Sequence, residues 1–290
     1  MNVRPSLRAG SFYDATPEKC RQHAENLLAE ADLPDDLPSR LYGGLVPHAG
    51  WVFSGRVAAK TLKALAAAGD VGTLVVFGAD HTGSVRLGEV YDSGAWNTPL
   101  GDAEIDEKLA AALLQAAECL RANPDAHAYE HSIEVQVPLI QVLWPEAKLV
   151  PVAVPPTALA AEMGRAIGKT IREGFPRVRV LGSTDLTHHG GHFGSPGGRG
   201  KAGVDWAVEN DRRMLDIVKA MQAEMVVPEA EKRMNACGAG AIAASIAACK
   251  EMGAARAVVL EYTNSYQVMR ETYPGNLDDT TVGYASVVFG

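Results

Sequence analysis

The sequence predicts a single α/β domain whose central sheet, mixed or mostly parallel, is flanked by helices. Short apolar runs of strand length alternate with stretches of helical periodicity through most of the chain, as in a sheet with helices on both faces. The 290 residues are 47% hydrophobic and contain no internal repeat and no low-complexity linker. A chain of this kind can bury one large core. We therefore expect residues 1–290 to form one domain.

Local signals place the elements in chain order. Thr16 is a suitable N-cap for a first helix, and Gly50 and Gly55 bracket a turn into the second. A continuous apolar run marks residues 73–78 as a buried strand. The glycine-rich segment 190–203 is expected to be a mobile loop and a candidate lid. The expected helices are 17–31, 56–68, 102–117, 131–143, 157–173, 205–221 and 237–252. The expected strands are 42–47, 73–78, 87–91, 148–154, 178–183, 257–262 and 282–289.

Composition excludes several classes of function. The formal net charge is −8 and no cluster of basic residues occurs, so neither nucleic acid nor an anionic membrane surface is an expected partner. The chain contains no run of 18 apolar residues, so no membrane span is expected, and residues 1–13 lack the apolar core of a signal peptide. The four cysteines are scattered without a CxxC pair, which favours a reducing, cytoplasmic compartment over a disulfide framework.

A histidine or a cysteine follows a strand-like run at several distant places in the chain. His48 and His81 end two such segments, His188 follows a third, and Cys237 stands at the expected start of a helix. Loops at the carboxyl ends of strands in an α/β sheet converge on one crevice. Imidazole and thiolate groups gathered there predict one metal site. The helix start is expected to lower the pKa of the Cys237 thiol and to favour the thiolate.

Four polar residues in or near these segments each have two interpretations. Asp80 either orients a ligating imidazole or caps a turn. Asp185 and His188 form an acid/base pair in which the carboxylate fixes the histidine tautomer, or His188 is a metal ligand and Asp185 caps a turn. His131, at an expected helix start, either points into the cleft or has no role beyond the helix.

Two aromatic residues are further candidates for the pocket. Tyr262 follows a strand and is expected to line the pocket, whereas Trp51 is either a pocket wall or an ordinary core residue. The chain has no GxxxxGK[ST] phosphate-binding loop, no GxSxG nucleophile elbow and no HExxH zinc motif. The remaining three cysteines, in amphipathic or apolar patterns, fit buried packing.

These segments together resemble the Memo family, whose prokaryotic members are called AmmeMemoRadiSam system protein B. The matching motifs, from one end of the chain to the other, are RAGSFY (8–13), PHAGW (47–51), FSG (53–55), GADH (78–81), EHSIE (130–134), STD (183–185), ACG (236–238), YTNS (262–265) and VGYA (282–285). The family in turn resembles the LigB-type class III extradiol ring-cleaving dioxygenases. Those enzymes have a related α/β fold and hold non-haem Fe(II) through two histidines and a glutamate.

The resemblance implies roles for five residues. His48 and His81 match the two histidine ligands, and His188 matches a histidine that acts as acid and base beside the metal. Cys237 stands where the Memo family has a cysteine in place of the carboxylate ligand, and Asp185 matches a pocket residue. The resemblance makes Fe(II) the first expected metal, and because a thiolate is softer than a carboxylate, copper and zinc are the alternatives.

Three functions follow as hypotheses. The first is a metal-dependent redox protein, dioxygenase-like, acting on an unidentified small molecule. The second is a non-catalytic module on a degenerate dioxygenase fold that binds a ligand, a phosphopeptide or a protein, because Cys237 replaces a carboxylate. The third is hydrolysis assisted by zinc. The prokaryotic family name also implies an AMMECR1-like protein and a radical SAM protein as partners.

Overall fold

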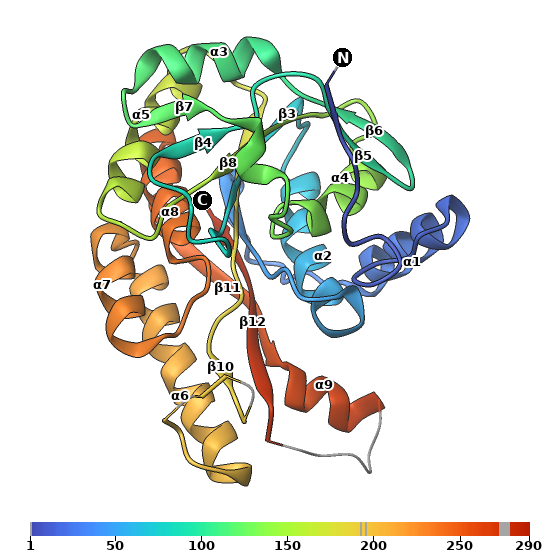
Figure 1. The fold of residues 1–290 in the computed structure, drawn as a ribbon, viewed down its shortest axis with the longest axis vertical. Coiled ribbons are helices and arrows are strands. Elements are labelled where there is room, and N and C mark those ends of the chain that lie inside the picture. The colour runs from blue at the N-terminus through green and yellow to red at the C-terminus, as the bar shows by residue number, and fades with distance from the viewer. Residues whose placement is uncertain (1, 192, 195, 273–278) are drawn as a thin grey trace.

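A mixed β-sheet runs through the centre of the computed structural model, which describes residues 2–191, 193–194, 196–272 and 279–290 (Figure 1). The strands are β1 (Val3–Arg4), β2 (Gly43–Val46), β3 (Thr73–Gly78), β4 (Gly88–Val90), β5 (Ala95–Thr98), β6 (Gly101–Glu104), β7 (Leu120–Ala122), β8 (Lys148–Ala153), β9 (Val178–Ser183), β10 (His188–His189), β11 (Ala257–Asn264) and β12 (Thr281–Phe289). The helices are α1 (Pro17–Glu30), α2 (Trp51–Ala67), α3 (Glu107–Ala116), α4 (Val137–Leu143), α5 (Leu159–Gly174), α6 (Gly200–Lys219), α7 (Ala223–Arg233), α8 (Ala239–Met252) and α9 (Ser265–Thr272). Two short 3₁₀ helices, η1 (Pro124–His127) and η2 (Glu134–Gln136), precede α4.

The four central strands of the sheet are parallel, and antiparallel pairs join them to the strands on either side. The strand order is β10-β12-β2-β9-β3-β8-β4-β7. Strand β10 pairs with the first two residues of β12, and β11 pairs with residues 283–289 of the same strand. Strands β2, β9, β3 and β8 run parallel to one another, while β12 and β4 pair antiparallel with β2 and β8. A second, small sheet has the order β1-β5-β6. The structure therefore confirms a single-domain α/β fold with a mixed sheet flanked by helices.

Two hydrophobic cores lie on opposite faces of this sheet. In β3, Val75 and Phe77 belong to the core under α5 and α8, whereas Leu74 and Val76 belong to the core under α1 and α2. Successive strand side chains point to opposite faces, so a strand covered on both sides is apolar at every position. Figure 1 shows α5 and α8 on one side of the sheet and α1 and α2 on the other. Both layers hold the central strands rigidly, and these strands carry the candidate site.

Two expected boundaries are wrong for identifiable reasons. Residues 102–104 lie in β6 instead of a helix, because Gly101, at φ +111°, turns the chain from β5 into β6. Helix α3 begins after Asp106, whose carboxylate accepts the Leu109 amide at 3.0 Å as an N-cap. Helix α2 begins at Trp51, and Gly55 lies within it instead of ending a turn. A Cβ at Gly55 would lie 2.7 Å from Leu27 of α1, so the glycine permits close helix packing.

Other differences concern helix starts and short elements. The helix expected over 131–143 becomes regular only in α4, after the 3₁₀ turn of η2, and the helix expected over 205–221 begins earlier, in α6. Helices α7 and α9 were not expected, since Pro228 interrupts the pattern of α7 and α9 buries no residue. Positions 192 and 195 of the expected loop lie outside the described residues. Within the described chain, no helix is both long and apolar enough to cross a bilayer.

Candidate metal centre

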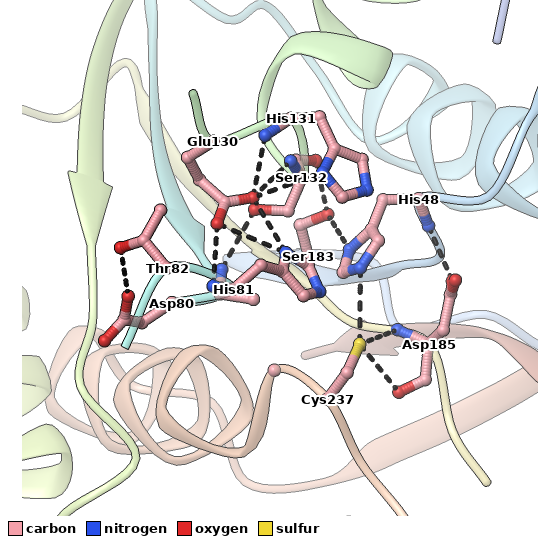
Figure 2. Close-up of polar contacts among 12 residues, drawn as sticks. His48, Asp80, His81, Thr82, Glu130, His131, Ser132, Ser183, Asp185 and Cys237 are labelled. Atoms are coloured by element: carbon pink, nitrogen blue, oxygen red, sulfur yellow. Dashed lines mark hydrogen bonds and ion pairs between the residues drawn. The ribbon is translucent and has the colours of Figure 1, made fainter. Parts of the chain in front are cut away.

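Adjacent parallel strands bring the predicted residues to one edge of the sheet. His48, Asp185 and His81 follow the carboxyl ends of β2, β9 and β3, which are neighbours in that order. Cys237 precedes α8, whose N-cap Gly238 donates its amide to Thr184 Oγ1 at 3.0 Å. Figure 2 shows these side chains gathered in one cluster.

One set of three side chains in the cluster could together hold a metal ion. His48, His81 and Cys237 each offer one ligand atom within 4.8 Å of the other two. Metal bonds of about 2.0–2.3 Å to imidazole nitrogen and thiolate sulfur require the ligand atoms to lie only a few ångströms from one another, as these do. A second set, His81, Glu130 and His131, is equally compact. The oxygens of Glu130 are occupied by N–H groups, however, so the first set is the better candidate.

The tautomer of His48 is fixed by a chain of hydrogen bonds. Ser183 Oγ donates to the carbonyl oxygen of Ser132 at 2.7 Å, so it accepts a hydrogen bond from His48 Nδ1 at 3.0 Å (Figure 2). This leaves a lone pair on His48 Nε2, which lies 3.3 Å from Cys237 Sγ. Burial and the neighbouring His81 hold the pKa of His48 well below its usual range. The ring is therefore neutral, as a metal ligand must be.

His81 is oriented by the buried carboxylate of Glu130. Glu130 accepts the His81 amide at 2.9 Å and His81 Nδ1 at 3.0 Å, which leaves Nε2 of His81 free for a metal. The amides of His131 and Ser132 also donate to Glu130, each at 2.8 Å. Burial opposes ionisation of Glu130, but these hydrogen bonds outweigh it and hold its pKa well below the usual range. A carboxylate behind a ligating imidazole is a common feature of metal sites.

Glu130 and Ser183 were not among the residues predicted for the site. Both lie in segments noted for their histidine and aspartate, but their role depends on distant partners. A glutamate directly before a histidine carries no distinct local signal. A histidine that needs an orienting carboxylate is the only hint that sequence offers.

The thiol of Cys237 differs from its expected state. Burial raises its pKa well above the usual range, and the nearby Asp185 adds to the effect. The expectation of a lowered thiol pKa is wrong, because Cys237 lies outside the first turn of α8 and desolvation outweighs the helix end. Its sulfur contacts His48 Nε2 and accepts the Asp185 amide, both at 3.3 Å. A bound metal cation would favour the thiolate.

Asp185 and His188 make hydrogen bonds with different partners and not with each other. The Asp185 carboxylate accepts the His48 amide at 2.8 Å, and burial raises its pKa to about 7 although the amides of His48 and Ala49 oppose this. Nδ1 of His188 donates to the Leu186 carbonyl at 3.0 Å, so that carbonyl, and not Asp185, fixes the tautomer. Burial lowers the pKa of His188. Its Nε2 is thus an unprotonated base near neutral pH.

His131 lies within the cluster. Its ring stacks on that of His81 with a centroid separation of 4.7 Å and lies 5.5 Å from the His48 ring. Phe12 covers another side, with its ring edge-to-face at 5.1 Å. Burial and the charge of His81 lower the pKa of His131 to about 4, so it is neutral. His131 is therefore a wall of the site.

The other three predicted residues have structural contacts of their own. Asp80 caps a turn, accepting the Thr82 hydroxyl at 2.8 Å and the Val85 amide at 3.0 Å. Trp51 is a core residue, 2% exposed, whose indole N–H donates to the Val135 carbonyl at 3.0 Å. The Tyr262 hydroxyl donates to Asp211 on α6 at 2.7 Å.

Comparison with known proteins shows what this chain is similar to. The model of a family described as Memo-like protein matches residues 4–288. A MEMO1 family protein of Methanopyrus kandleri is 37% identical, with 97% of this chain and 96% of that protein covered. One from Thermococcus kodakarensis is 36% identical, with 99% of each chain covered. Among solved structures, an uncharacterized protein of Escherichia coli K12 matches with a TM-score of 0.47 at 12% identity, over 76% of this chain and 86% of that one.

Proposed function

This chain belongs to the Memo family, and from that premise we propose that it is a metal-dependent redox protein. One observation carries the proposal: His48, His81 and Cys237 present three ligand atoms within 4.8 Å of one another. Ser183 and Glu130 hold the Nδ1 atoms of His48 and His81, so Nε2 is the nitrogen that each ring offers to a metal. Such prior orientation of ligands is typical of a metal site and unnecessary for a purely structural cluster.

The donor set fits iron(II), which we propose as the resident metal, with copper as its main competitor. Two imidazoles and a thiolate are borderline to soft ligands, and the thiolate widens selectivity beyond the iron favoured by two histidines and a carboxylate. When bound, the ion would supply one-electron chemistry and open coordination positions for a chelating small molecule. The four cysteines are free, which fits the proposed cytoplasmic location.

His188 is the residue proposed to move protons. Its Nδ1–H is held by the Leu186 carbonyl, so a proton can be taken up or released only at Nε2. The lowered pKa keeps the ring neutral near pH 7, and it would therefore act first as a base. Asp185 would act by holding the His48 loop, through the backbone amide it accepts at 2.8 Å.

A non-catalytic binding function is the second candidate, favoured by the raised pKa of the Cys237 thiol, which disfavours the thiolate when no metal is bound. A protein that keeps this thiol without metal would recognise a ligand or a partner, including the AMMECR1-like and radical SAM proteins that the family resemblance implies. Oxygen consumption with catechol as a probe separates the two functions. The redox proposal predicts metal-dependent uptake that His188→Gln abolishes, whereas the binding proposal predicts none.

Metal analysis after anaerobic purification tests the proposed site. We expect about one iron or copper per wild-type chain and a loss of at least tenfold in His48→Ala and Cys237→Ala. Cys249→Ala is the matched control, since Cys249 is also a free cysteine but is fully buried and packs between apolar residues. Full metal retention in both site variants would contradict the proposal.

A further inference from the structure

Arg8 is a half-buried arginine whose charge has no partner in the described chain. Its guanidinium makes no ion pair and no hydrogen bond with any described residue, and its Nε is fully buried without an acceptor. The guanidinium lies over the Phe12 ring, with Cζ 5.0 Å from the ring centroid. A buried N–H group without an acceptor costs about 1–3 kcal/mol. This arrangement is therefore typical of a group that binds a ligand.

A series of ring contacts connects Arg8 to the metal centre. The Phe12 ring beneath the guanidinium meets His131 edge-to-face at 5.1 Å, and His131 stacks on His81 at 4.7 Å. The Phe12 and His131 rings therefore link the guanidinium to the metal centre, which places Arg8 at the rim of the cluster.

The backbone around Arg8 is held in place independently of its side chain. Glu134, 1% exposed, accepts the amides of Leu7 and Arg8 at 2.8 and 2.7 Å and the Tyr13 hydroxyl at 2.8 Å. Its other oxygen pairs with Arg4 at 2.8 Å. The negative charge of Glu134 is therefore already neutralised, and Arg8 keeps an uncompensated positive charge on a fixed segment.

We propose that Arg8 binds an oxyanion, a carboxylate or a phosphate, on a small molecule whose other end reaches the metal centre. The planar guanidinium fork matches both groups through paired N–H···O bonds. The oxyanion would supply the acceptor that Nε lacks and would balance the charge of the arginine. This inference rests on the proposed function for the metal-binding end of the ligand, and it narrows the substrate class to anionic small molecules.

Two probes that differ by one carboxylate test this inference. Catechol and 3,4-dihydroxybenzoate share the two adjacent oxygens of a chelator, and calorimetric titration gives the Kd of each for the protein as purified. We expect wild type to bind 3,4-dihydroxybenzoate at least tenfold more tightly than catechol, Arg8→Gln to lose that preference, and Arg8→Lys to keep part of it. Competition by benzoate or by phenyl phosphate identifies which oxyanion the site prefers.

Arg177→Gln is the matched control. Arg177 is an exposed arginine before β9, at the opposite end of the strands from the metal centre, and pairs with Asp70 at 2.7 Å. This variant should keep the full preference for the carboxylated probe. If wild type does not prefer that probe, or if Arg8→Gln keeps the preference, the role of Arg8 is refuted.

Metal analysis of the same samples separates this inference from the proposed function. Metal bound without a preference for the anionic probe refutes the role of Arg8 and leaves the metal centre standing. An Arg8-dependent preference in a protein that holds no metal refutes the metal centre and supports the oxyanion site.

Discussion

Replacing Glu130 by glutamine should weaken metal binding through His81. Four N–H groups donate to the carboxylate: the amides of His81, His131 and Ser132 and the Nδ1–H of His81, at 2.8–3.0 Å. Glutamine keeps one acceptor oxygen and turns its NH₂ group toward at least one of these donors. Loss of an orienting partner of this kind costs 10–100-fold in metal affinity, or about 1.4–2.8 kcal/mol.

The same change should also destabilise the metal-free protein. Glu130 is 1% exposed, so a backbone N–H that loses its acceptor there stays buried. An orphaned donor of this kind costs about 1–3 kcal/mol, and we expect a loss of about 2 kcal/mol in the free energy of unfolding. Urea unfolding of the metal-free protein measures this loss of stability, and competition with a chelator of known affinity measures the metal Kd.

Glu134→Gln is the matched control for Glu130→Gln. Glu134 is equally buried and accepts several N–H and O–H groups, but its partners are Arg4, Leu7, Arg8 and Tyr13 and include no histidine. It should lose at least as much stability while the metal Kd of the folded protein stays within about twofold of wild type. An unchanged metal Kd in Glu130→Gln would refute the role assigned to Glu130.

Three further predictions follow from the structure. Burial raises the pKa of Asp211 to about 7, so between about pH 4 and pH 7 this carboxyl group stays protonated in the folded protein but ionises in the unfolded chain. The stability that Asp211 contributes is therefore complete below about pH 4 and is lost as pH rises toward 7. From pH 4 to pH 8, the unfolding free energy of Asp211→Asn should rise by about 3 kcal/mol relative to that of wild type, as measured by urea unfolding at both pH values. Gly238→Ala should lower metal content severalfold, because its Cβ would lie 2.5 Å from the Ser183 carbonyl oxygen, whereas Gly174→Ala, with nothing within 4 Å, should not. His188→Gln should keep its metal by elemental analysis, and equal metal loss in His188→Gln and His48→Ala would contradict its assignment as a proton carrier.

The sequence predicted well where local pattern and fold agree. The apolar runs of β3 and β9 reproduce their observed bounds because both strands are covered on two faces, and the strand order then brings His48 and His81 to one edge. Spacing along the chain could not show that Glu130 orients His81, since those residues are 49 positions apart. It also could not show that Asp185 turns to the His48 amide instead of His188, because that choice depends on how β2 and β9 are paired.

The thiol of Cys237 illustrates a second limit. A nearby helix start predicts a lowered pKa, but burial acts in the opposite direction and is larger. Burial of a single side chain is a property of the packed fold, and the residues that contact the Cys237 sulfur, His48 and Asp185, follow β2 and β9, far away in the chain. The ionisation of this thiol therefore depends on whether a metal is bound.

X-ray absorption spectroscopy of the metal-loaded protein tests the central claim most directly, because it identifies the ligand atoms. The account predicts one sulfur scatterer at about 2.3 Å and imidazole nitrogens at about 2.0–2.1 Å in wild type. The sulfur contribution should vanish in Cys237→Ser and persist in Cys249→Ser. A metal surrounded only by nitrogen and oxygen in wild type would contradict the His48, His81 and Cys237 centre.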